Sequence, residues 1–202
     1  MMKARTSIVV LATLASGFAR SQETFTPVNV TFAGWVSFRL PLADNGESRH
    51  PCISGDGRHV AFESDSTDLI SSDANGRQDV FVRDLVNHTA NHTTELVSVN
   101  TSEQTGNGDS STVGEVGRNA LGSDRRFVLF RSEATDLVVG DTNGIADLFV
   151  RDRVASTTER VSVTDAEGQL SRASRVAQMS ADGNRILFRS NALELGATPH
   201  LE

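Results

Sequence analysis

Short runs of apolar residues, separated by glycine, aspartate and asparagine, recur along this chain of 202 residues. Runs of this length indicate β-strands, and no stretch after residue 19 shows the 3.6-residue periodicity of an amphipathic helix. In one unit the runs predict four strands, at 51–54, 59–64, 79–85 and 93–100. Gly-Asp-Gly at 55–57 predicts a tight turn between the first two, because these residues tolerate a positive φ. We therefore expect antiparallel four-stranded sheets.

The second and third predicted strands are apolar at consecutive positions, not only at alternate ones. Val60-Ala61-Phe62 is one example, and residues 128–130 repeat the pattern as Val-Leu-Phe. A strand of this kind must be covered on both faces. Sheets stacked around an axis, as in a β-propeller, meet this requirement, whereas a two-sheet sandwich would give a cleaner alternation.

The whole unit is repeated 68 residues further along the chain. The first copy contains 56–64, 73–84 and 94–99, the second contains 124–132, 141–152 and 158–163, and a third begins at 180–190. Repetition at this spacing indicates modules that bury their apolar surfaces against their neighbours.

The shared string is Ser-x-Asp-Gly-Arg-x-Val-x-Phe-x-Ser, then Asp-x-Asn-Gly-x-x-Asp-Val-Phe-Val-Arg-Asp, then Thr-Glu-x-Val-Ser-Val. Over residues 35–190 it resembles the TolB-like (WD-type) β-propeller repeats of bacterial exported proteins. The resemblance implies an all-β fold of four-stranded propeller blades. It also implies a non-catalytic binding or scaffold module that presents loops to a protein or cell-envelope partner. The second copy departs from the motif at Gly122-Ser-Asp-Arg125, where Asp-Gly is expected, so its turn lies outside the pattern.

The repeats predict an incomplete propeller. We assign a signal peptide to 1–19, an N-terminal partial blade to 20–50, complete blades to 51–118 and 119–175, and a C-terminal partial blade to 176–202. Propellers close with about four to eight blades, so this chain is too short to close one alone. Three explanations stay open: a fragment of a longer propeller, an arc completed by a partner, and a homodimer. In the homodimer, segments 24–31 and 35–40 would complete the C-terminal half-blade of the other chain.

The first 19 residues combine a cationic head, Lys3 and Arg5, with an apolar stretch at 8–15 and small residues around Ala19. This pattern is typical of a secretory signal peptide and predicts a periplasmic or secreted protein; a buried N-terminal helix is the alternative. No other stretch is long and apolar enough to be a transmembrane segment. The formal net charge of −7 argues against nucleic acid as a partner. Cys52 is the single cysteine and is expected in a buried strand.

Two loops have a spacing that suits a metal ligand set: Asp73, Asn75 and Asp79 in the first copy, and Asp141, Asn143 and Asp147 in the second. Alternate oxygen side chains, a glycine and a later carboxylate are typical of Ca²⁺ loops. Each loop nevertheless lacks the bidentate acid of a full calcium loop. The same residues form an ordinary turn, in which aspartate caps backbone N–H groups and Asn-Gly accepts left-handed geometry. A calcium-stabilised structural repeat protein is therefore an alternative function, and calcium is the one cofactor considered.

The sequence contains no Gly-x-Ser-x-Gly elbow, His-Glu-x-x-His motif, phosphate loop or dinucleotide fingerprint. We therefore predict that the chain is not an enzyme. The alternative is the propeller domain of a larger hydrolase or lyase whose catalytic residues lie outside this chain. Asp84 and Asp152, at strand ends, are expected to pair with neighbouring blades or turns, and Phe62, Phe130 and Phe188 are expected in the core.

Overall fold

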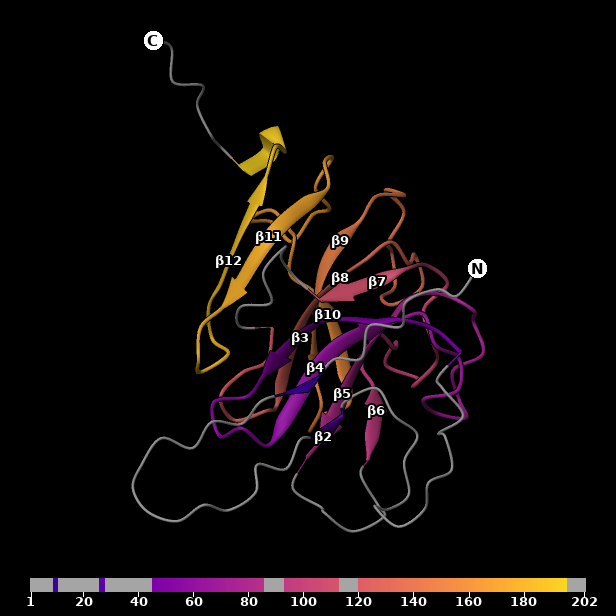
Figure 1. Cartoon of the computed structure of the whole chain (residues 1–202). Coiled ribbons are helices and arrows are strands. Elements are labelled where there is room, and N and C mark those ends of the chain that lie inside the picture. Colours follow the sequence, from indigo (N-terminus) through magenta and orange to yellow (C-terminus); the bar gives the residue numbers. More distant parts are fainter. Residues whose placement is uncertain (1–8, 11–25, 28–44, 86–92, 113–119, 196–202) are drawn as a thin grey trace, which may run out of the picture.

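Strands dominate the computed structural model, which describes residues 9–10, 26–27, 45–85, 93–112 and 120–195 (Figure 1). Helical structure in this part of the chain is limited to one 3₁₀ turn, Leu193–Leu195. The strands form two four-stranded antiparallel sheets and two two-stranded ones. The all-β fold with four-stranded antiparallel sheets is therefore confirmed. None of the described residues belongs to a helix with the length and apolar character needed to cross a bilayer.

Each four-stranded sheet is formed by strands that are consecutive in the chain. The first sheet contains β3 (Ser48–Ile53), β4 (His59–Ser64), β5 (Asp79–Asp84) and β6 (Thr94–Leu96). The second contains β7 (Ser110–Thr112), β8 (Phe127–Ser132), β9 (Asp147–Asp152) and β10 (Thr157–Arg160). The third sheet is the hairpin of β11 (Ser174–Met179) and β12 (Ile186–Ser190). A separate pair joins β1 (Val9–Val10) to β2 (Thr26–Pro27).

The leading strand of each four-stranded sheet begins earlier than the sequence pattern suggested. β3 begins at Ser48 and β7 at Ser110, before the blade boundaries placed at 51 and 119. These strands start with polar residues that pair at the sheet edge, so no apolar run marks their beginning.

The fourth strand of the first sheet is shorter than expected. Near its end, a side-chain hydroxyl and not a backbone carbonyl accepts a hydrogen bond from β5. β6 ends at Leu96. Two residues later, the Ser98 hydroxyl accepts the backbone N–H of Val80 (3.0 Å) and donates to the Asp79 carboxylate (2.5 Å). The chain is thus held against β5 beyond the end of the regular strand.

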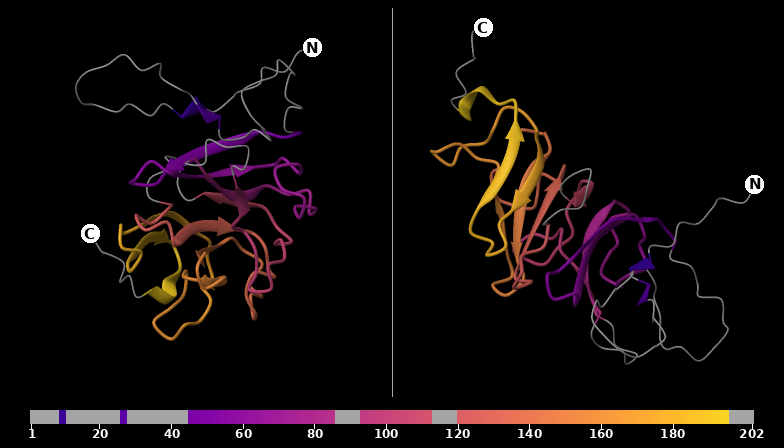
Figure 2. Two further views of the ribbon diagram at one scale, coloured as in Figure 1. Left: turned by 90° about the horizontal axis from the view of Figure 1, so that it is seen from below. Right: turned by 60° about the vertical axis from the view of Figure 1, so that its left-hand side comes forward.

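The second sheet is covered on both faces, as expected for strands with consecutive apolar residues. Leu129, Phe130 and Phe149 have no exposed surface. They belong to a core that also includes Val82 from the first sheet and Met179 from the hairpin. Figure 2 shows the three sheets side by side in chain order. Cys52 on β3 is buried in the same core, as predicted.

The opposite face of the first sheet carries a second buried cluster that includes Phe62 and Phe81. Their rings stack with centroids 5.7 Å apart, and Phe130 and Phe149 repeat this pair at 5.7 Å in the second sheet. Phe188 on β12 was also expected in the core, but it is only partly buried. β12 is an edge strand, and within the described residues no further sheet covers it.

The described sheets do not close into a ring. Within the predicted signal peptide at 1–19, only Val9–Val10 belong to the described residues. The strand predicted at 35–40 lies outside the described residues, as does all of 24–31 except Thr26–Pro27.

Candidate functional site

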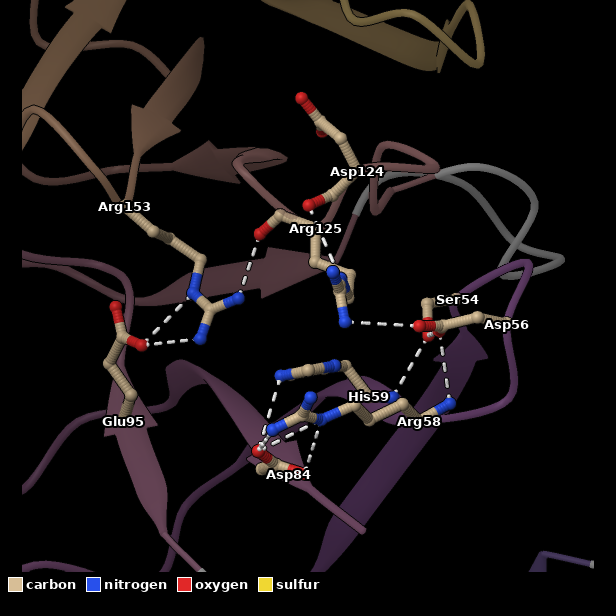
Figure 3. A network of polar contacts seen from close by, with 9 residues as sticks. All are labelled: Ser54, Asp56, Arg58, His59, Asp84, Glu95, Asp124, Arg125 and Arg153. Atoms are coloured by element: carbon tan, nitrogen blue, oxygen red, sulfur yellow. Dashed lines mark hydrogen bonds and ion pairs between the residues drawn. The ribbon is translucent and has the colours of Figure 1, made fainter. Parts of the chain in front are cut away.

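An open pocket of about 330 Å³ lies where the first and second sheets meet. We call it the arginine pocket, after the four arginines among its lining residues, and we call the junction between the two sheets the seam. The first sheet contributes Arg58, His59 and Glu95, and the second contributes Asp124, Arg125, Arg126, Arg153 and Val154. Figure 3 shows most of these side chains converging at the seam, His59 and Glu95 from strands β4 and β6 and the others from turns.

Two of the arginines are fixed by an aspartate of their own sheet. Arg58, in the turn before β4, contacts both carboxylate oxygens of Asp84 at 2.7–3.2 Å. Arg126 contacts Asp152 in the same way at 2.6–2.9 Å. The Arg126 guanidinium is the main cause that lowers the pKa of Asp152 to about 2. Of the two arrangements expected for these aspartates, pairing with a neighbouring turn is the one that these contacts show.

Two further arginines reach across the seam. Arg125 Nη1 lies 3.1 Å from Asp56 Oδ2 in the turn between β3 and β4. Arg153 donates to Glu95 at 2.7 and 2.9 Å, and to the carbonyl oxygen of Arg125 at 2.7 Å. The two acidic side chains are 43% and 39% exposed, and ion pairs in such contact with water contribute only about 0–1 kcal/mol. An incoming anion can therefore displace them at small cost.

Arg125 adopts a left-handed backbone conformation with φ of 65°. The equivalent residue is Gly57 in the first turn (φ 69°) and Gly183 in the third (φ 72°). A residue with a Cβ atom costs about 1–2 kcal/mol in this conformation, whereas glycine adopts it freely. The aspartate bond of the turn is kept, since Asp124 Oδ1 accepts the N–H of Arg126 at 3.0 Å, although Gly122 replaces the serine that donates to the aspartate in the other two turns. The departure from the motif therefore preserves the turn and places an arginine in the pocket.

His59 is buried beside these arginines. Its Nε2 lies 3.7 Å from Asp84, and its Nδ1 has no hydrogen-bond partner among the described residues. Desolvation is the main cause that lowers its pKa, and the charges of Arg153 and Arg125 lower it further. The imidazole is thus neutral at pH 7, and the positive charge of the pocket comes from guanidinium groups.

The two loops predicted from Asp-x-Asn-Gly-x-x-Asp fold as turns centred on the asparagine. Asn75 Nδ2 donates to Asp79 Oδ2 (2.7 Å) and to the carbonyl oxygen of Gly106 (3.0 Å), while its Oδ1 accepts the N–H of Arg77 (2.8 Å). In the second copy, Asn143 makes the equivalent bonds with Asp147, Leu170 and Ile145 at 2.9–3.3 Å. Each asparagine therefore turns its amide nitrogen, not its oxygen, toward the later aspartate.

The first aspartate of each loop has different surroundings in the two copies. Asp73 is 4% exposed, and neither of its carboxylate oxygens has a hydrogen-bond partner. The carboxylate oxygens of Asp141, its counterpart, also have no hydrogen-bond partner, but one of them lies 3.4 Å from the guanidinium of Arg160, which is also 3.9 Å from Asp147. Leu96 occupies the position of Arg160 in the first copy.

Burial raises the pKa of several carboxyl groups in these loops. It raises that of Asp73, where the nearby backbone N–H of Asn75 opposes the effect, and that of Asp141, which Arg160 partly offsets. It raises the pKa of Asp79 to about 6, against hydrogen bonds from Ser98 and Asn75. Among the described residues, no group of three or more His, Cys, Asp or Glu side chains is arranged to hold a metal ion.

Sequence reasoning did not identify the arginine pocket. Its residues come from separate turns and strand ends of two units, and they share no spacing motif. One signal was present: the second copy has Arg125 where the repeat requires glycine. Comparison with models of protein families and with curated proteins gives no match to this chain. The resemblance to TolB-like repeats therefore stays a prediction that rests on the motifs.

Proposed function

We propose that this chain is a non-catalytic binding module, exported from the cell, whose arginine pocket recognises an acidic segment of a partner protein. We also infer that each four-stranded sheet is a propeller blade. The consecutive strand order and the covering of the second sheet on both faces support this inference. Export is supported by the N-terminal pattern of residues 1–19.

The observation that carries the proposal is the conformation of Arg125. Its left-handed backbone is unfavourable for any residue with a Cβ atom, and two equivalent turns avoid the penalty with glycine. Non-glycine residues held in such conformations cluster at binding and active sites, where the surrounding structure maintains the strain. A guanidinium at this point of the pocket is therefore the feature that we connect with function.

The charges of the pocket favour a carboxylate ligand. Four arginines line it. Arg58 and Arg126 are neutralised by Asp84 and Asp152, whereas Arg125 and Arg153 are paired with the partly exposed Asp56 and Glu95, which a ligand carboxylate can replace. A guanidinium presents parallel N–H donors that match a carboxylate in a bidentate arrangement. Because the chain as a whole has a net charge of −7, the clustered guanidinium donors of this pocket are where an acidic segment would find partners.

The ionisable groups of the pocket support binding rather than proton transfer. The arginines are held in ion pairs, and desolvation with the neighbouring guanidinium charges lowers the pKa of His59. A buried neutral imidazole, whose Nδ1 has no hydrogen-bond partner among the described residues, fills the wall of the pocket rather than transferring protons.

The test is the binding of a fluorescein-labelled Glu/Asp-rich peptide, followed by anisotropy at low and high salt, with a Gln/Asn peptide of equal length as the reference. Arg125→Gly should weaken binding about 10- to 100-fold, because a hydrogen bond to a charged group contributes about 1.5–3 kcal/mol. The same substitution should leave the melting temperature unchanged or raise it, since it relieves backbone strain.

Arg49→Gln is the matched control: it removes the same charge from the opposite end of the first sheet, where Arg49 pairs with Glu47. It should leave peptide binding unchanged. Equal binding by wild type and Arg125→Gly would refute the proposal, and so would a loss of affinity that only accompanies unfolding. Binding of inorganic phosphate without binding of the acidic peptide would reassign the pocket to a phosphate-bearing ligand.

A further inference from the structure

We propose that the first of the two Asp-x-Asn-Gly loops, residues 73–79, binds one hard divalent cation of the Ca²⁺ class, and that the second loop does not because Arg160 occupies the equivalent place. This site is separate from the arginine pocket and does not depend on the function proposed above.

The cation site is centred on Asp73. Its side chain is more than nine-tenths buried, neither carboxylate oxygen has a partner at hydrogen-bond geometry, and the one stabilising group nearby is the backbone N–H of Asn75. Burial of an ionised carboxylate without a partner is strongly unfavourable, and proteins compensate it with a counter-charge or a bound metal. An orphaned anion in a folded loop therefore points to a cationic ligand.

A second negative charge lies beside it. Asp79 is fully buried, and its charge and that of Asp73 repel each other. Among the described residues, no Lys, Arg or His comes within ion-pairing distance of either carboxylate. Hydrogen bonds from Asn75 and Ser98 already hold the oxygens of Asp79. Asp73 would accordingly be the direct carboxylate ligand, and Asp79 would act chiefly through its charge.

The loop supplies the remaining requirements of a hard cation. The chain turns sharply at Gly76, which has φ of 65°, and the Asn75 side chain fixes the turn to Arg77 and Gly106. Backbone carbonyls and water complete the oxygen shell of Ca²⁺ in sites with few carboxylates, and such sites bind in the 10⁻⁴–10⁻³ M range. This range is suited to calcium concentrations outside the cell.

The second loop is a control that the chain itself provides. It has the same two aspartates, the same asparagine and a glycine with the same φ of 65°. It differs in having Arg160 against its aspartates, with the guanidinium 3.4 Å from Asp141 and 3.9 Å from Asp147. Leu96 stands at this position in the first copy, and the arginine of the first loop, Arg77, lies near Asp109 (3.9 Å) and not against Asp73 or Asp79.

The experiment is a calcium titration of chelator-treated full-length protein at pH 7.5, by calorimetry and by thermal unfolding, with Mg²⁺ as the comparison ion. Wild type should bind one Ca²⁺ and melt about 3–10 °C higher at 10 mM Ca²⁺, from a dissociation constant of about 0.1–1 mM. Asp73→Asn, which keeps the shape of the side chain, should abolish both effects. Arg160→Leu should raise the stoichiometry to two, and Leu96→Arg should lower it to zero.

Circular dichroism checks that each variant is folded before its binding is compared. Wild type that neither binds Ca²⁺ nor melts higher in its presence would overturn the proposal. An Asp73→Asn variant with an unchanged calcium response would also overturn it, because the ion would then bind elsewhere. A folded Arg160→Leu variant that still binds a single ion would refute the exclusion of the second loop.

Discussion

Truncation of Phe130 to alanine tests the central packing arrangement, in which the second sheet is covered on both faces. The Phe130 ring has no exposed surface and stacks on Phe149 with centroids 5.7 Å apart. Removal of a fully buried phenylalanine side chain destabilises a protein by about 3–5 kcal/mol, through lost burial and the remaining cavity. In a domain of this size each kcal/mol lowers the melting temperature by about 2–4 °C, so we expect a decrease of about 6–20 °C.

The assay is urea unfolding monitored by far-UV circular dichroism, with thermal melts in parallel. Phe62, the repeat equivalent on the first sheet, also has no exposed surface, so Phe62→Ala should destabilise the protein by a similar amount. Leu187→Ala on β12 is the control. Its side chain is 73% exposed, and the change should stay within about 0.5 kcal/mol.

The reasoning would be refuted if Phe130→Ala lowered the free energy of unfolding by less than about 1 kcal/mol. That result would mean that the ring has no close neighbours on one face of the second sheet, and the shared core would not exist in solution. A large effect of Phe130→Ala with a negligible effect of Phe62→Ala would instead show that the outer face of the first sheet is open.

Three further substitutions test the turns and the ion pairs. Asn143→Ala should destabilise the protein by about 2–3 kcal/mol in urea titrations, because the buried Asp147 carboxylate loses a donor; full stability would show that the turn does not depend on the amide. The pKa of Asp152 is lowered to about 2, below its unfolded value, so its stabilising effect relative to Asp152→Asn should be complete above about pH 4 and decline toward pH 2; a difference independent of pH in acid titrations would contradict this. Gly183→Ala should loosen the C-terminal hairpin, because φ is +72° and a Cβ atom would lie 2.5 Å from the Phe127 ring; limited proteolysis that leaves the hairpin as resistant as in wild type would argue against that contact.

The strands with strong local patterns were predictable from the sequence. His59–Ser64 has the predicted bounds, and Asp79–Asp84 ends one residue before the prediction. Consecutive apolar residues correctly indicated burial on both faces, because a solvated face would require polar residues at alternate positions. The turn at Gly57 was also predicted, since glycine adopts its positive φ without strain.

The arrangement of charges could not be predicted in the same way. The arginine pocket joins turns that are far apart in the chain, and only the packing of two sheets brings Arg125 to Asp56 and Arg153 to Glu95. The difference between the two Asp-x-Asn-Gly loops depends on Arg160, thirteen residues beyond the last aspartate of its loop. Local spacing identifies such a loop but does not show which charge faces it.

The buried position of Cys52 makes its thiol a natural probe for opening of the core. It is the single thiol in the sequence and is buried in the core shared by the first and second sheets. A maleimide dye can reach it only while the core around β3 is open, so the labelling rate under native conditions measures how often this part of the core opens. No engineered probe is needed to follow whether ligands, salt or calcium suppress that opening.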